Sequence, residues 1–241
     1  MTELVLVGIG TGNPDHLTRE AIRALNGADV ILIPRKEDAP GLATLRRAIL
    51  AEVLDRPVPM VEFDLPKRDP AIAEYAARVA AWHDAIAQVW AQAIPPQGRA
   101  AMMVWGDPSL YDSTLRIAAR LSVDVRVIPG ITSVQALCAA HGIPLNEVGE
   151  PVLVTTGRRL RDGGWPSDAA TVVVMLDGEC SFGCLDPAGI DIWWSAYAGM
   201  PQQISIAGPL PEVAARIVAA RHEARAIHGW IMDIYLMRRR S

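Results

Sequence analysis

Short apolar runs alternate with amphipathic stretches along the whole chain. Runs such as 28–33 and 100–105 are typical of strands that are buried on both faces of a sheet. Segment 70–94 carries apolar side chains at intervals of three and four residues, which is typical of a helix packed on a sheet. The pattern predicts strands at 3–9, 28–33, 100–105, 123–128, 151–156, 170–176, 190–196, 203–207 and 230–236, and helices at 14–26, 40–54, 70–94, 112–121, 132–141 and 210–225.

This alternation predicts an α/β fold with largely parallel sheets, because parallel strands need a crossover connection that is usually a helix. The 241 residues can form one domain or two small ones. We expect a division just after Gly106-Asp107-Pro108, which gives an N-terminal α/β domain over 1–112 and a C-terminal α/β domain over 113–241.

A glycine-rich loop, Gly8-Ile9-Gly10-Thr11-Gly12, directly follows the first apolar run. Glycines at a strand end let the backbone approach a ligand closely and leave amide groups free to donate. A dinucleotide site needs the spacing G-x-G-x-x-G and an acidic residue after the next strand. Here the spacing is G-x-G-x-G and the next strand ends in Pro34-Arg35-Lys36. A nicotinamide-dependent oxidoreductase is therefore an alternative that these residues disfavour.

A second turn, Gly106-Asp107-Pro108-Ser109-Leu110-Tyr111, leaves the apolar strand at 100–105. Gly106 permits close backbone approach, and Asp107-Pro108 fixes a turn. The carboxylate of Asp107 can attract a cationic ligand or accept hydrogen bonds from an amine. The alternative is a purely structural turn, in which Asp107 binds its own backbone.

A third segment, Pro129-Gly130-Ile131-Thr132-Ser133, joins the strand at 123–128 to a predicted helix. Thr132 or Ser133 can cap this helix or offer a hydroxyl group to a ligand. Ligands in α/β sheets collect at the carboxyl ends of the strands. Three strand-end loops of this kind in one chain therefore predict a small-molecule site.

Composition narrows the classes of protein and partner. The formal net charge is −4, which gives no basic surface for nucleic acid. We find neither a signal-peptide pattern nor an apolar run of the roughly 20 residues that span a membrane. The three cysteines are an odd number, and Cys180 and Cys184 have no second pair at metal-binding spacing. We therefore expect a cytoplasmic protein without disulfides, metal, nucleic acid or membrane partner.

The three loops together resemble those of the tetrapyrrole (cobalamin precursor) methyltransferase family, which uses S-adenosylmethionine. That family carries G-x-G-x-G-x-P-x-x-L-T, G-D-P-x-x-Y and P-G-I-x-S in this order, as do residues 8–18, 106–111 and 129–133. The resemblance spans essentially the whole chain. It implies two α/β domains with an S-adenosylmethionine cleft between them, a tetrapyrrole substrate and a homodimer.

The resemblance also implies roles for individual residues. Residues expected to bind the co-substrate are Gly106, Asp107, Pro108, Leu110, Thr132, Ser133, Leu176 and Gly199. The first glycine loop, with Gly8, Gly10, Thr11 and Gly12, is expected to lie near the tetrapyrrole. Tetrapyrrole substrates carry many carboxylates, and arginine binds a carboxylate with a planar fork. Candidate arginines are Arg35, Arg46, Arg47, Arg161 and, above all, Arg158 and Arg159.

Segments 107–116, 149–160 and 228–233, with Trp193-Trp194, are similar to the branch of the family that converts precorrin-5 to precorrin-6A. That reaction methylates C-1 and releases acetate. Loss of the acetyl group needs water at a carbonyl carbon, which a general base assists. We hypothesise Asp107 or Tyr111 in that role, with His141 and Glu150 as further candidates. The alternatives are a methyltransferase acting on another precorrin carbon or on a protein side chain, and a non-catalytic tetrapyrrole carrier.

Overall fold

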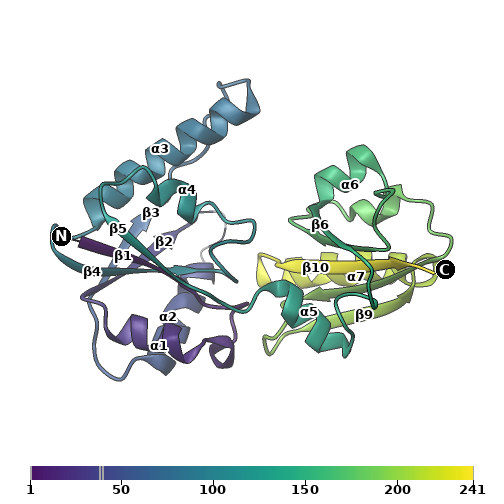
Figure 1. The fold of residues 1–241 in the computed structure, drawn as a ribbon, viewed down its shortest axis with the longest axis horizontal. Helices are drawn as coiled ribbons and strands as arrows, with labels where there is room; N and C mark the ends of the chain where they lie inside the picture. The colour runs from purple at the N-terminus through teal and green to yellow at the C-terminus, as the bar shows by residue number, and fades with distance from the viewer. Residues whose placement is uncertain (1, 38, 40, 241) are drawn as a thin grey trace. The chain divides into compact units, whose positions relative to one another are not determined.

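The computed structural model describes residues 2–37, 39 and 41–240. The chain folds as two compact units, Met1–Thr132 and Ser133–Ser241 (Figure 1). The boundary expected from the sequence, between 112 and 113, lies inside the first unit. The reason is that the strand Asp124–Ile128 pairs with the strand Thr2–Gly8 and so belongs to the first sheet.

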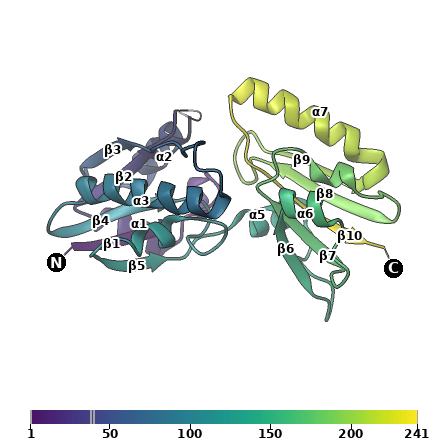
Figure 2. The same cartoon turned by 90° about the horizontal axis from the view of Figure 1, so that it is seen from above.

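The first unit contains a parallel sheet with the strand order β3-β2-β4-β1-β5 (Figure 2). Its central strands are the near-continuous apolar runs that the sequence shows, as expected for strands covered on both faces. The strands are β1 (Thr2–Gly8), β2 (Val30–Arg35), β3 (Met60–Asp64), β4 (Gly98–Val104) and β5 (Asp124–Ile128).

Helices cover both faces of this sheet (Figure 1). Successive strand residues point to opposite faces, so Val5 and Val7 of β1 pack with one pair of helices while Leu4 and Leu6 pack with the other. The first pair is α1 (Arg19–Asn26) and α2 (Gly41–Val53), and the second is α3 (Tyr75–Ala93) and α4 (Thr114–Ala118). A 3-10 turn, η1 (Pro14–His16), follows the glycine-rich loop.

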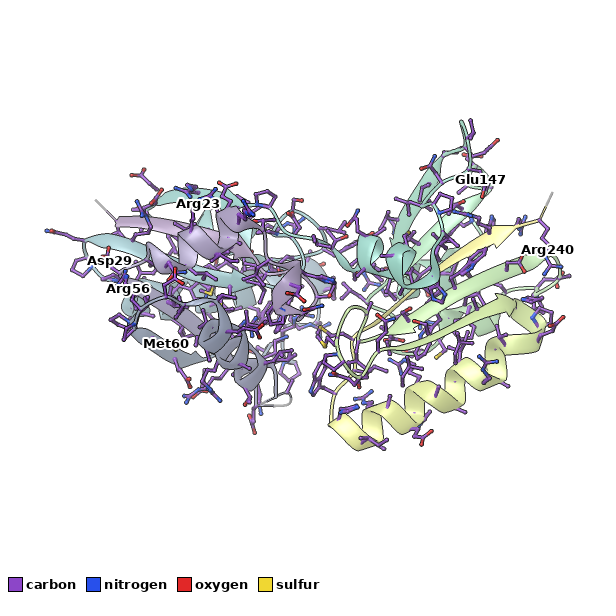
Figure 3. The ribbon with its side chains drawn as sticks, turned by 90° about the horizontal axis from the view of Figure 1, so that it is seen from below. Arg23, Asp29, Arg56, Met60, Glu147 and Arg240 are labelled. Carbon is purple, nitrogen blue, oxygen red and sulfur yellow. The ribbon has the colours of Figure 1, made fainter. Side chains whose placement is uncertain are left out.

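Structural contacts hold the amino-terminal edge of the first sheet. The Arg56 guanidinium donates to the carbonyl groups of Asn26, at 3.1 Å, and Ala28, at 3.0 Å. The backbone N–H of Arg99 donates to the carboxylate of Asp29 at 2.7 Å. Figure 3 labels Asp29 and Arg56 in this part of the unit. The glycine-rich loops leave from the opposite, carboxyl edge.

The second unit contains a mixed sheet with the order β6-β7-β10-β8-β9. The expectation of largely parallel sheets is wrong here, because the last strand inserts between β7 and β8 and runs antiparallel to both. Only β6 and β7 pair in parallel. The strands are β6 (Val152–Thr156), β7 (Thr171–Met175), β8 (Ile190–Ala196), β9 (Ile204–Pro209) and β10 (Asp233–Arg239).

Helices also pack on both faces of the second sheet. Trp194 shares its face of the sheet with α7 (Leu210–His228), whereas Ser195, on the opposite face, contacts His141 at the end of α5 (Ser133–His141). The remaining elements are α6 (Gly157–Gly163) and η2 (Ser181–Cys184). The helices predicted from the sequence do not include α6. That helix buries only Gly157 and Leu160, so it has no apolar stripe to reveal it.

A buried ion pair joins α7 to the first residue of β10. The Nε of Arg221 donates to the Asp233 carboxylate at 2.9 Å, and the indole N–H of Trp194 donates to the same oxygen at 3.0 Å. A second guanidinium nitrogen of Arg221 donates to the Asp177 carbonyl at 3.2 Å. Removing one member of such a pair leaves a buried charge without compensation.

We therefore expect Arg221→Met to lower the free energy of unfolding by about 3–5 kcal/mol, because Asp233 loses its cation. Urea denaturation monitored by tryptophan fluorescence measures this difference. The control is Arg216→Met, an exposed position on the same helix. A difference below about 1 kcal/mol, the range of surface pairs, would contradict the assignment of the pair as a structural anchor.

Candidate functional site

Three loops meet at the carboxyl edge of the first sheet. They leave β1, β4 and β5, and β1 lies between the other two strands. The first two loops pair with each other: the N–H of Ile9 donates to the Val104 carbonyl at 2.9 Å, and the N–H of Gly106 donates to the Gly10 carbonyl at 2.7 Å. The strand pairing thus continues past the sheet and fixes the spacing of the loops.

Glycine is required where the loops touch. A Cβ at Gly8 would lie 2.6 Å from the nitrogen of Gly130 and 2.9 Å from the carbonyl oxygen of Gly106. A Cβ at Gly130 would collide with that same oxygen and lie 2.8 Å from the carbonyl carbon of Gly8. These neighbours are backbone atoms, which cannot swing aside as a flexible side chain can. The three loops can pack this closely only because they lack side chains at these positions.

The side chain of Asp107 ties the second loop to the third. Its carboxylate accepts from the N–H of Ser109 at 2.8 Å, from the Ser109 hydroxyl at 2.5 Å and from the N–H of Gly130 at 2.9 Å. Partial burial alone would raise the pKa of Asp107, but the hydrogen bonds from Ser109 and Gly130 outweigh it and hold the pKa below its usual value. The group is therefore an anion at neutral pH.

The loops adopt backbone conformations that glycine favours. Gly10, Gly12 and Gly106 have φ values of +70°, +114° and +63°. Thr11 is nearly buried, and its hydroxyl lies 3.2 Å from Nδ1 of His16. Tyr111 has φ +49° although it carries a side chain, and it is 44% exposed. Such strain in a non-glycine residue is often found at functional sites.

Most of the sequence-predicted residues of the first unit come together at this edge. Gly106, Asp107 and Pro108 form the turn, and the N–H of Leu110 donates to the Asp107 carbonyl at 3.2 Å. Thr132 follows the third loop, and a Cβ at Gly106 would lie 3.7 Å from its Cα. Ser133 is the first residue of α5 and belongs to the second unit. The first unit thus brings the backbone of the second and third loops together beside the Asp107 carboxylate.

The second unit has two strained residues at one edge of its sheet. Leu176 follows β7 with φ +53° and is 67% exposed, and Tyr197 follows β8 with φ +51°. The start of β10 lies between these two strand ends, and the Tyr197 N–H donates to the Met232 carbonyl at 2.8 Å. Gly199, two residues beyond, donates its N–H to the side chain of Gln203 at 2.6 Å. The sequence-predicted Leu176 and Gly199 therefore leave from the same edge.

Asp177 is a residue of this edge that sequence reasoning missed. Its buried carboxylate accepts from the Tyr235 hydroxyl at 2.7 Å, the Ser181 N–H at 2.6 Å and the Glu179 N–H at 3.1 Å. Burial opposes the charge, but these hydrogen bonds hold the pKa of Asp177 below its usual value. They fix the turn that presents Leu176. The available signal was an Asp-Gly pair directly after an apolar strand.

The candidate arginines are not equivalent. Arg35 binds Asp64 with two hydrogen bonds, at 2.9 and 3.0 Å, and Arg47 binds Glu62 at 2.6 Å. Arg161 pairs with Glu179 at 2.9 Å. Arg158 and Arg159 lie exposed in the first turn of α6, where the Arg159 N–H donates to Thr156. Arg46 differs from all of these in being buried.

The other candidate general bases are placed differently. Nε2 of His141 lies 3.1 Å from the Trp194 carbonyl and 3.1 Å from the Ser195 hydroxyl, on the second sheet. Burial lowers the pKa of His141, and the hydrogen bond to Trp194 only partly offsets this. The imidazole is therefore neutral at neutral pH. Glu150 is exposed in the segment before β6.

The described residues form neither a metal-binding cluster nor a membrane-spanning helix. Residues 2–37, 39 and 41–240 contain no group of three or more His, Cys, Asp or Glu side chains placed to hold a metal ion. Within the same part of the chain, no helix is both long and apolar enough to cross a bilayer.

Comparison with known proteins identifies the family. The model of the Tetrapyrrole (Corrin/Porphyrin) Methylases matches residues 3–214, so the chain belongs to this family. A precorrin-6A synthase [deacetylating] from Sinorhizobium is 46% identical over 251 aligned positions, which cover 99% of this chain and 96% of that protein. The resemblance inferred from the three loop motifs is thereby confirmed.

Solved structures confirm the two-sheet α/β fold. The crystal structure of a cobalamin synthesis related protein (CobF) from Corynebacterium diphtheriae has a TM-score of 0.82 and 37% identity, and covers 99% of both chains. The uroporphyrin-III C-methyltransferase of Thermus thermophilus, complexed with S-adenyl homocysteine, has a TM-score of 0.59 and 22% identity, and covers 98% of this chain and 96% of that one. The second likeness concerns the fold alone.

The close packing of the Gly130 backbone against Gly8 and Gly106 can be tested by substitution. We expect Gly130→Ala to lower the free energy of unfolding by about 1–3 kcal/mol, because the new methyl group must displace backbone. Gly163→Ala is the matched control, since nothing lies within 4 Å of a Cβ there, and it should be neutral or slightly stabilising. Chemical denaturation of both variants makes the comparison. Equal stability of the two variants would contradict the packing described.

Proposed function

We propose that this chain catalyses the S-adenosylmethionine-dependent methylation of precorrin-5 at C-1, coupled to loss of its acetyl group, in cobalamin biosynthesis. The products are precorrin-6A, S-adenosylhomocysteine and acetate. The observation that carries the proposal is the full-length similarity to a precorrin-6A synthase, together with the three family loops at one edge of the first sheet. The similar CobF structure from Corynebacterium diphtheriae is also that of a cobalamin synthesis related protein.

The co-substrate is assigned to the loops after β4 and β5 and to the edge of the second sheet. Asp107 is an anion there, and so suits a ligand that carries an amine and a sulfonium. Exposed Leu176, held by the Asp177 turn, offers an apolar contact of the kind an adenine ring requires. The full set proposed is Gly106, Asp107, Pro108, Leu110, Thr132, Ser133, Leu176 and Gly199.

Methyl transfer makes modest demands on the protein. C-1 of the macrocycle attacks the methyl carbon in line with the carbon–sulfur bond, and the sulfur leaves with the bonding electron pair. The attacking carbon belongs to an electron-rich ring system, so alignment and exclusion of water supply much of the acceleration. Loops whose spacing is fixed by backbone contacts suit this task, because they hold a ligand without needing to reorganise.

Deacetylation is a hydrolysis and makes a different demand. Water adds to the acetyl carbonyl, the bond from that carbon to the macrocycle breaks, and its electron pair returns to the ring. The Asp107 carboxylate already accepts three hydrogen bonds and has a lowered pKa, which makes it a weak base. Tyr111, which is 44% exposed on the same loop, is therefore the stronger of the two candidates.

The tetrapyrrole is assigned to the first glycine loop, with Gly8, Gly10, Thr11 and Gly12, and to the exposed guanidinium groups of Arg158 and Arg159. These two arginines can bind carboxylate groups of a large ligand. We further propose a homodimer and a cytoplasmic location, and no resident metal.

Anaerobic incubation of the purified protein with precorrin-5 and S-adenosylmethionine tests the function. We expect mass spectrometry to show one product that has gained a methyl group and lost an acetyl group, with free acetate in equal amount. Methylation without acetate would separate deacetylation from this chain. Unchanged precorrin-5, with S-adenosylmethionine bound but not consumed, would contradict the proposed substrate.

The role of Tyr111 is tested by Tyr111→Phe in the same assay. Loss of a general base should slow acetate release by about 10²–10⁴-fold, while methylation proceeds. Tyr75→Phe, a similarly exposed tyrosine on α3, is the control. Acetate release at the wild-type rate would remove Tyr111 from the mechanism.

A further inference from the structure

Arg46 is a buried cation that has no acidic partner among the residues that the structure describes. The residue is 7% exposed, and no carboxylate among the described residues lies within ion-pair distance of it. Its neighbour Arg47, one position along α2, is exposed and pairs with Glu62. Buried arginines are ordinarily paired, because an unpaired charge in the interior loses its hydration without replacement. Arg46 therefore needs an explanation that Arg47 does not.

Two contacts hold the Arg46 side chain, and neither neutralises it. Its Nε donates to the carbonyl of Met103 in a long hydrogen bond of 3.4 Å, and its guanidinium carbon lies 4.7 Å from the centre of the Trp105 ring. The two terminal nitrogens make no hydrogen bond to any described residue. The indole N–H of Trp105 is itself a buried donor that has no hydrogen-bond partner in the described part of the chain. The pair thus keeps several unused donors.

The charge persists despite burial. Burial lowers the pKa of the Arg46 guanidinium to about 10, and the charge of the Asp112 carboxylate partly opposes this shift. The side chain is therefore cationic at neutral pH. The Met103 carbonyl and the Trp105 ring hold the planar guanidinium group of Arg46 in one orientation. Such a fork, with its terminal donors unused, matches the geometry of a carboxylate.

The position of Arg46 connects it to the candidate site. Strand β4 ends at Val104. Met103 precedes this residue and Trp105 follows it, directly before the Gly106 turn. Helix α2 packs against η1, which follows the first glycine loop. Arg46 therefore lies at the carboxyl edge of the first sheet, next to the loops assigned to the ligands. Arg35, which ends β2 at the same edge, is already paired with Asp64.

We propose that Arg46 binds a carboxylate of a ligand of this enzyme, as a fixed anchor for its orientation. The inference rests on the proposed function, because both ligands named there carry the required group. The tetrapyrrole has several carboxylate side chains, and S-adenosylmethionine has one. The residue binds and positions its ligand and takes no part in proton transfer.

Steady-state kinetics with each ligand varied in turn tests the anchor and separates the two sources. Arg46→Gln should raise KM for the anchored ligand about 10–100-fold, the effect of losing a charge-assisted hydrogen bond, with little change in kcat. Arg46→Lys should recover part of this loss, and the control Arg23→Gln, at an exposed position on α1, should leave both KM values unchanged. A raised KM for precorrin-5 assigns the tetrapyrrole, and a raised KM for S-adenosylmethionine assigns the co-substrate. Unchanged KM values for both would overturn the proposal.

A stability measurement distinguishes a role of Arg46 in ligand binding from a role in stabilising the fold. If Arg46 is kept for ligand binding, Arg46→Met should keep or raise Tm, because an apolar chain of similar length replaces an unpaired buried charge. A large fall in Tm, with unchanged KM values in the folded fraction, would make Arg46 a structural residue and overturn the proposal.

Failure of the proposed function has a different signature. A wild-type protein that leaves precorrin-5 unchanged refutes the function, yet the anchor is still testable by binding. Calorimetric titrations with S-adenosylmethionine and with uroporphyrin III, a stable tetrapyrrole polycarboxylate, are then compared between wild type and Arg46→Gln. Weaker binding of either probe by the variant supports the anchor, and equal binding of both overturns it.

Discussion

The site depends on how closely three backbone segments approach one another at Gly8, Gly106 and Gly130. Any side chain at Gly8 or Gly130 would meet main-chain atoms of the other loops. This contact continues the pairing of β1 with its neighbours beyond the sheet. The loops are therefore held in place by three adjacent parallel strands. A rigid cradle of backbone groups is what an alignment-driven methyl transfer needs, because misplacement of the reacting atoms is costly.

Asp107 adds charge to this geometric constraint. Its carboxylate closes the gap between the second and third loops and remains ionised because Ser109 and Gly130 donate to it. Asp177 does the same at the edge of the second sheet, where it holds the turn that carries Leu176. In both units a carboxylate right after a strand end is satisfied by nearby N–H and hydroxyl groups and so fixes a strained loop. Neither carboxylate is thereby left with much basicity.

Much of the fold and of the site was predictable from the sequence, and the features that were not predicted have physical explanations. The apolar runs predicted the first sheet, and the three loop motifs predicted the family. β3 was missed because most of its residues are exposed and give no apolar run. The strand predicted at 230–236 overlaps β10, but its antiparallel direction was not predicted, because strand direction depends on the path of the chain, which local periodicity does not encode. The sequence does not distinguish Arg46 from Arg35 and Arg47. In the structure Arg46 is buried, whereas Arg35 and Arg47 form ion pairs.

A crystal structure of this protein with S-adenosylhomocysteine tests the role of the glycine contacts most directly. We expect the methionine part of the ligand to contact the Gly106-Asp107-Pro108 turn, and the positions of Gly8, Gly106 and Gly130 to match those in the ligand-free structure. A ligand bound without contact to this turn, or loops that separate to admit it, would contradict the claim that the glycine contacts form a ready-made co-substrate site.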